Sequence, residues 1–173
     1  NPFGVMYNPI SILHSLTRWL TDTTERPDVV IFTLGTNHVY RLKRTGEIVD
    51  NCKKQPQSWF QEEELSVADC AKVLEEAIQQ VKNRNANAKI VLTVSPIRYQ
   101  KYGFHGSQLS KATLLLATHE LVKAGKADYF PAYEIMNDAL RDYRFYAEDM
   151  LHPTPQAVSY IWEAFEKAYF SAK

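Results

Sequence analysis

Hydrophobic positions along the chain form continuous runs typical of buried strands and spaced sets typical of amphipathic helices. The β-branched and aromatic run at 29–34 predicts a strand buried on both faces. Apolar runs at 89–94 and 128–130 predict two further strands. Helical patterns separate these runs, so the order of elements predicts a parallel sheet covered by helices.

Capping residues mark where the helices begin. The first is expected to begin at Asn8-Pro9, because Asn can cap a helix and Pro suits its first position. The second is expected from Ser66, which forms a capping-box pair with Asp69, to about residue 84. Further helices are predicted at 107–123, at 134–140 and from Thr154-Pro155 onward. The last is expected to bury an apolar face of Val158, Ile161, Trp162, Phe165 and Tyr169.

One segment breaks this alternation. Residues 40–49 predict a hairpin that turns at Thr45-Gly46. We expect it to form part of an inserted hairpin or loop, residues 39–56, near the functional site. The insert is basic, with Arg41, Lys43, Arg44, Lys53 and Lys54. The acidic run at 62–64 is predicted to be a solvated segment before a helix.

The predicted elements define an α/β fold, a three-layer α/β/α arrangement of flavodoxin-like type, in a single domain of residues 1–173. Three strands are few for a sheet covered by so many helices, because an apolar edge would stay unpaired. Either a strand escapes this prediction, or strands upstream of Asn1 are missing from the chain. We favour missing N-terminal strands, and the start without Met agrees with an N-terminally truncated domain.

Composition excludes several classes of protein. The 20 basic and 20 acidic residues give zero net charge, so we expect no nucleic-acid partner. An apolar fraction of 45% excludes disorder, and no run approaches the roughly 18 apolar residues that a membrane span needs. Two cysteines outside any C-x-x-C pair and histidines without ligand spacing predict no metal and no cofactor. The chain shows no signal-peptide pattern, which favours a cytoplasmic location.

The strongest chemical signal is an Asp-x-x-His spacing just before the last helix. The two residues between Asp149 and His152 let both side chains point into one loop. The carboxylate can then accept a hydrogen bond from one imidazole nitrogen and leave the other nitrogen free as a base. A structural loop pair is an equal alternative. The loop's place at the carboxyl ends of the strands favours catalysis, because open α/β sheets bind ligands there.

Polar residues also follow the first two predicted strands. Gly35 and Asn37 offer a backbone N–H and a side-chain amide to an oxyanion, or they simply form and cap a turn. His38 is expected either to contact substrate or to lie in a solvated turn. Arg98, after the second strand, is a candidate for binding an anionic or polar substrate group, with a surface ion pair as the alternative.

The Gly-x-Asn and Asp-x-x-His blocks together resemble the SGNH (GDSL-type) hydrolases. Other segments resemble the GSCFA domain family, among them NPFGVMYNP at 1–9 and LRDYRFYAED at 140–149. The similar segments follow one another along nearly the whole chain, at 33–36, 39–40, 51–52, 54–56, 94–96 and 129–134. The resemblance implies an SGNH-like fold and a catalytic class rather than a particular substrate.

The sequence departs from the GSCFA pattern in three places. It lacks the Gly-Ser-Cys-Phe-Ala motif, whose Ser matches the nucleophile and which in the family precedes the Asn-Pro-Phe-Gly stretch. Family members tend to have His where Lys53 and Tyr99 stand, which puts substrate contacts at these positions in doubt. No G-x-S-x-G elbow replaces the motif, and Ser95 is followed by Pro96, which blocks the usual turn into a helix. We therefore expect the nucleophile upstream of Asn1.

The resemblance implies a serine ester hydrolase that acts on acyl or acetyl esters of a small molecule or a glycan. His152 would serve as base and then acid, and Asp149 would orient it. Gly35, Asn37 and Gly4 would stabilise the oxyanion. Without the nucleophile, the chain alone is expected to be inactive.

The alternative function is a non-catalytic module of the same fold. In that case the basic hairpin and the aromatic pair Trp59-Phe60 would bind a carbohydrate or an acidic partner.

Overall fold

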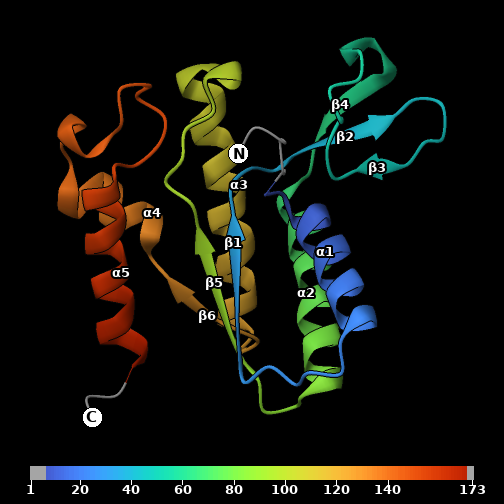
Figure 1. The fold of residues 1–173 in the computed structure, drawn as a ribbon, viewed down its shortest axis with the longest axis horizontal. Helices are drawn as coiled ribbons and strands as arrows, with labels where there is room; N and C mark the ends of the chain where they lie inside the picture. The colour runs from blue at the N-terminus through green and yellow to red at the C-terminus, as the bar shows by residue number, and fades with distance from the viewer. Residues whose placement is uncertain (1–6, 171–173) are drawn as a thin grey trace.

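The computed structural model describes residues 7–170, in which strands and helices alternate (Figure 1). The helices are α1 (Pro9–Asp22), α2 (Val67–Arg84), α3 (Gly103–Lys123), α4 (Ala132–Glu134), which continues as a π-helical segment at Ile135–Leu140, and α5 (Pro155–Tyr169). The strands are β1 (Val29–Leu34), β2 (His38–Leu42), β3 (Ile48–Val49), β4 (Phe60–Glu64), β5 (Lys89–Val94) and β6 (Asp128–Phe130). Short 3-10 helices occupy Gln57–Trp59, Gln100–Tyr102 and Tyr143–Phe145. Within this part of the chain, no helix has the length and apolar character needed to cross a membrane.

Three helix starts carry the predicted caps. The Asn8 side chain accepts a hydrogen bond from the backbone N–H of Ser11 at 2.9 Å. Ser66 and Asp69 make both bonds of a capping box, and Thr154 caps α5. Helix α3 begins at Gly103, four residues before the predicted start at 107.

Strands β1, β5 and β6 form a parallel sheet in the order β1-β5-β6. The register pairs Val29 with Lys89 and Leu34 with Val94, so β1 and β5 end level with each other. Helices α1, α2 and α3 pack on one face of this sheet, and α5 packs on the other (Figure 1). The α/β class and the mainly parallel sheet between helical layers are therefore confirmed.

The two faces of the sheet are covered unequally. Phe32 and Leu34 of β1 are buried in the main core with α1, α2 and α3. On the opposite face, Phe165 of α5 packs against Val91 of β5 and Phe130 of β6. Helix α5 thus covers β5 and β6 rather than β1.

The prediction that β1 is buried on both faces is wrong for this reason. Val29 is 53% exposed and Ile31 is 43% exposed, on the face that α5 leaves open. Two residues of α5 that were expected to be buried, Val158 and Trp162, are also exposed. The outer edge of β1 has no strand partner among residues 7–170.

The segment after β1 forms a small antiparallel sheet in the order β3-β2-β4. The predicted hairpin is confirmed by the pairing of Arg41 with Ile48 around Gly46, which has a φ of 75°. The acidic run at 62–64 is exposed at Glu62 and Glu64, as predicted, but it also forms part of strand β4, which was not predicted. Its charges are balanced from other elements, since Arg41 pairs with Glu63 at 2.8 Å and Lys101 with Glu62 at 2.7 Å.

Candidate active site

The loop between Phe145 and α5 has a shape fixed by backbone hydrogen bonds. The N–H of Ala147 donates to the carbonyl of His152 at 2.8 Å, and the N–H of Thr154 donates to the carbonyl of Phe145 at 2.8 Å. Met150, at the turn of this loop, has a φ of 59°, in the left-handed region that non-glycine residues rarely adopt. The loop therefore presents its side chains in a defined arrangement.

The structure brings Asp149 and His152 into contact. The Nδ1 atom of His152 lies 2.5 Å from Oδ2 of Asp149. The other carboxylate oxygen, Oδ1, accepts hydrogen bonds from the backbone N–H groups of Leu151 at 2.9 Å and His152 at 3.0 Å. Both carboxylate oxygens are thus engaged, and the carboxylate fixes the orientation of the imidazole ring.

These hydrogen bonds also favour the ionised form of Asp149. The backbone N–H groups of His152 and Leu151, followed by the His152 side chain, lower the pKa of Asp149 from 3.8 to about 2. The His152 side chain is 54% exposed. No residue in the described part of the chain makes a hydrogen bond with its Nε2 atom, which is therefore available to a reacting group.

Arg98, the predicted substrate-binding residue, lies beside this pair. Its backbone N–H donates to the carbonyl of Leu151 at 3.1 Å, which ties the end of β5 to the Asp149–His152 loop. Its guanidinium lies 3.9 Å from the ring centroid of Tyr146 and 5.5 Å from that of Tyr143. This stacking holds the guanidinium, and within residues 7–170 Arg98 has no carboxylate partner. A substrate-binding role for Arg98 stays a prediction.

A cleft of about 740 Å³ opens next to Asp149. Arg98, Tyr99 and Ser107 contribute to its lining. Three exposed apolar side chains also line it, namely Phe104 (91% exposed), Tyr143 (65%) and Met150 (43%). These three residues could not be predicted from the sequence, because they lie on a helix start and in loops without hydrophobic periodicity.

The oxyanion candidates at the end of β1 are already engaged. The N–H of Gly35 donates to the carbonyl of Tyr7 at 2.7 Å. A Cβ at Gly35 would lie 2.5 Å from the Tyr99 hydroxyl and 3.1 Å from Tyr7 Cβ, so close side-chain packing accounts for this glycine. Asn37 is buried, and its side-chain amide donates to the carbonyl of Leu65 at 2.9 Å. Gly4, the third candidate, lies outside the described residues.

His38 does not lie in a solvated turn. Its ring is stacked on Tyr102 with centroids 3.6 Å apart, and only 8% of the residue is exposed. Its Nδ1 atom lies 3.0 Å from Glu62 and its Nε2 atom lies 3.2 Å from Glu64. The Nε2 contact is not aligned as a hydrogen bond. These contacts join β2 to β4, and a substrate-binding role for His38 stays a prediction.

A buried lysine at the ends of β1 and β5 was not found from the sequence. The Lys111 ammonium donates to the carbonyls of Gly35 and Ser95, both at 2.7 Å. Burial lowers the pKa of Lys111 from 10.5 to about 7. The helical pattern of 107–123 does not reveal this burial, because both partners of Lys111 are carbonyls of other segments, 76 and 16 residues away. Lys111 therefore joins the residues that directly follow β1 and β5.

The geometry describes an α/β protein with a His–Asp pair and a partly apolar cleft at the carboxyl ends of a parallel sheet. The chain belongs to the GSCFA family, whose family model matches residues 20–165. The suspected family membership is thus confirmed over most of the chain. Among curated proteins, none matches this sequence.

Proposed function

We propose that this chain carries the histidine–aspartate half of an SGNH-type serine ester hydrolase, whose nucleophilic serine comes from a segment upstream of Asn1. The observation that supports it most is the 2.5 Å contact between His152 and Asp149 beside an accessible cleft. The substrate would be an acyl or acetyl ester of a small molecule or a glycan.

In this proposal, the serine hydroxyl attacks the ester carbonyl while Nε2 of His152 takes its proton. The resulting imidazolium is stabilised by Asp149, whose pKa of about 2 keeps it ionised at neutral pH. The tetrahedral intermediate then expels the alcohol, which receives the proton from His152. A water molecule attacks the acyl-enzyme by the same route and releases the carboxylic acid.

The oxyanion donors remain predictions. The Leu65 carbonyl uses one of the two N–H groups of the Asn37 amide, so one is left for an oxyanion. Gly35 would have to release the Tyr7 carbonyl before its N–H could serve. Removing one oxyanion donor typically lowers the rate about 10²–10³-fold.

The open edge of β1 supports a nucleophile supplied by another strand. The outer side of β1 has no partner in the described range, and Val29 and Ile31 are exposed beside it. A parallel strand added there would end at the same edge of the sheet as the cleft, where its following residue could meet His152.

A fluorophosphonate probe tests this proposal, because it labels only an activated serine. In a protein extended to include the upstream segment, we expect one labelled serine upstream of Asn1, and His152→Ala should abolish labelling. His119→Ala is a matched control, since this histidine lies on α3 away from the cleft residues. Labelling of a serine within residues 1–173, or labelling that persists in His152→Ala, would contradict the proposal.

A further inference from the structure

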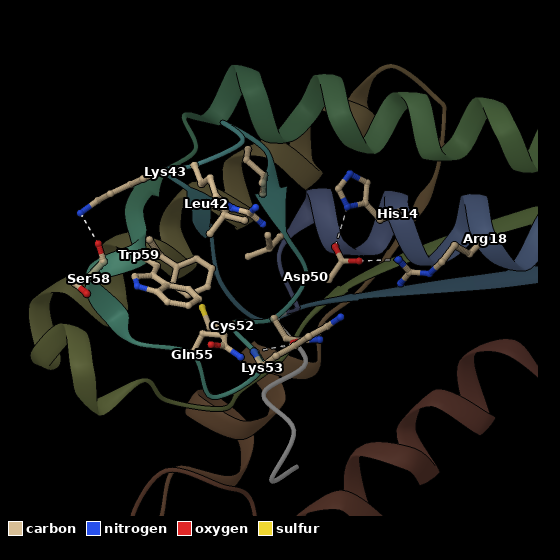
Figure 2. Close-up of a pocket in the computed structure, with 15 residues that line it drawn as sticks. His14, Arg18, Leu42, Lys43, Asp50, Cys52, Lys53, Gln55, Ser58 and Trp59 are labelled. Carbon is tan, nitrogen blue, oxygen red and sulfur yellow. Dashed lines mark hydrogen bonds and ion pairs between the residues drawn. The ribbon is translucent and has the colours of Figure 1, made fainter.

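A second cavity lies between α1 and the small β3-β2-β4 sheet, and it shares no lining residue with the cleft beside Asp149. Its volume is about 1060 Å³. Figure 2 shows its lining, with His14 and Arg18 reaching from α1 on one side and Trp59 lying on the other. The space is sufficient for a ligand of two or three sugar rings.

Basic side chains outnumber acidic ones in this lining. Four cationic residues line the cavity, namely Arg18, Lys43, Arg44 and Lys53. The single lining carboxylate, Asp50, forms an ion pair with Arg18 at 2.8 Å and also lies 2.8 Å from His14. Because the whole chain has zero net charge, this concentration of positive charge is local. It favours an anionic ligand.

Two of these cations have no hydrogen-bond or ion-pair partner among residues 7–170. Lys43 donates to the carbonyl of Ser58 at 2.8 Å. Arg44 and Lys53 are exposed, and their side chains make no ion pair or hydrogen bond with residues 7–170. These two groups are therefore the ones available to bind an acidic group of a ligand.

The loop that carries Lys53 is held in an unusual conformation. Lys53 and Lys54 have φ values of 45° and 56°, two successive non-glycine residues in the left-handed region. The Asn51 side chain accepts a hydrogen bond from the backbone N–H of Lys53 at 2.9 Å, which stabilises the turn. Backbone held in this region commonly occurs at ligand-binding segments.

An aromatic ring stands next to the cations. Trp59 is 52% exposed although it lines the cavity, so its indole offers an apolar surface to a ligand. Asn51, Gln55 and Ser58 add polar side chains that suit hydroxyl groups. A flat apolar ring, cations and neutral hydrogen-bonding groups together match a sugar that carries a carboxylate.

We propose that this cavity binds an acidic saccharide, with Trp59 against the face of one ring and Arg44 and Lys53 on its carboxylates. The site is separate from the proposed ester hydrolysis and does not depend on it. Single-stranded nucleic acid fits less well, because its binding sites stack successive bases on several exposed aromatic rings. Here Trp59 is the one large aromatic lining residue that is mostly exposed.

The test is calorimetric titration of the full chain with three probes. These are a galacturonic acid trimer, the neutral galactose trimer, and a thymidylate oligonucleotide with the same charge as the acidic trimer. We expect binding of the acidic trimer at least tenfold tighter than that of either other probe. Raising the salt concentration should weaken it, as for any charge-dependent contact.

Variants locate the binding in the cavity. Trp59→Ala and Lys53→Asn should each weaken binding of the acidic trimer at least tenfold, and Asn tolerates the left-handed conformation. Trp19→Ala and Lys72→Ala are matched controls, because both residues are exposed and neither lines the cavity. No binding of the acidic trimer, equal binding of the neutral trimer, tighter binding of thymidylate, or equal losses in the controls would overturn the proposal. Circular dichroism confirms that each variant is folded.

Discussion

The buried Lys111 predicts an unusual dependence of stability on pH. Only 2% of this residue is exposed, and its partners are two carbonyl oxygens rather than a carboxylate. Between pH 7 and 10.5 the folded protein has therefore lost this proton, whereas the unfolded chain still binds it. The state that binds more protons is favoured at low pH, so this lysine makes the free energy of unfolding rise as the pH increases above 7.

The magnitude follows from the pKa. A fall in the pKa of Lys111 from 10.5 to about 7 changes the free energy of unfolding by about 5 kcal/mol across the whole pH range between the two values, since one pKa unit is about 1.4 kcal/mol. Between pH 7 and 9.5, the free energy of unfolding should rise by about 3 kcal/mol more than in Lys111→Met. Stopping at pH 9.5 avoids the titration of Tyr99, whose pKa burial raises to about 12.

Urea denaturation followed by tryptophan fluorescence measures this difference. Lys111→Met leaves the carbonyls of Gly35 and Ser95 without their partner, which lowers stability by about 1–3 kcal/mol for each carbonyl. For that reason we compare how the free energy of unfolding changes with pH in the protein and in Lys111→Met, and not its absolute value in each. Lys72→Met, at an exposed position, should behave like the unsubstituted protein. Parallel curves for the protein and Lys111→Met from pH 7 to 9.5 would refute the reasoning.

Three further predictions concern the site and its support. Gly35→Ala should displace the Tyr99 ring and cost about 1–3 kcal/mol by overpacking, which urea denaturation measures; a loss below 0.5 kcal/mol would contradict the packing. Phe165→Ala should cost about 3–5 kcal/mol, because this ring joins α5 to Val91 and Phe130; the exposed Phe104→Ala is the control. The carboxyl carbon of Asp149 should titrate near pH 2 by NMR, and an ordinary midpoint near 3.8 would disprove its hydrogen bonds. Because this pKa is lowered on folding, the carboxylate adds stability above pH 3.8 and loses it as the pH falls through 2.

Local chemistry made the main elements predictable from the sequence. The caps at Asn8, Ser66 and Thr154 depend on residues within three positions, so each helix start could be read directly. The Asp149–His152 contact is equally local, since two intervening residues determine it. The hairpin at Gly46 follows from a turn that needs a positive φ.

Features that depend on distant packing were not predictable in the same way. The acidic strand β4 is stabilised by Arg41 and Lys101, which lie 22 and 39 residues away. Exposure of Ile31 and Trp162 depends on where α5 crosses the sheet, which no periodicity encodes. The buried Lys111 owes its place to two strand ends that meet only in the fold.

Turnover of p-nitrophenyl acetate measures the central claim most directly. A protein extended upstream to include the proposed serine should hydrolyse this ester, and His152→Ala should lower kcat by at least about 10³-fold. Residues 1–173 alone should show no turnover above the uncatalysed rate. Turnover by residues 1–173 that disappears in His152→Ala would place the nucleophile within this chain, and full activity of the extended His152→Ala variant would contradict the catalytic role of the pair.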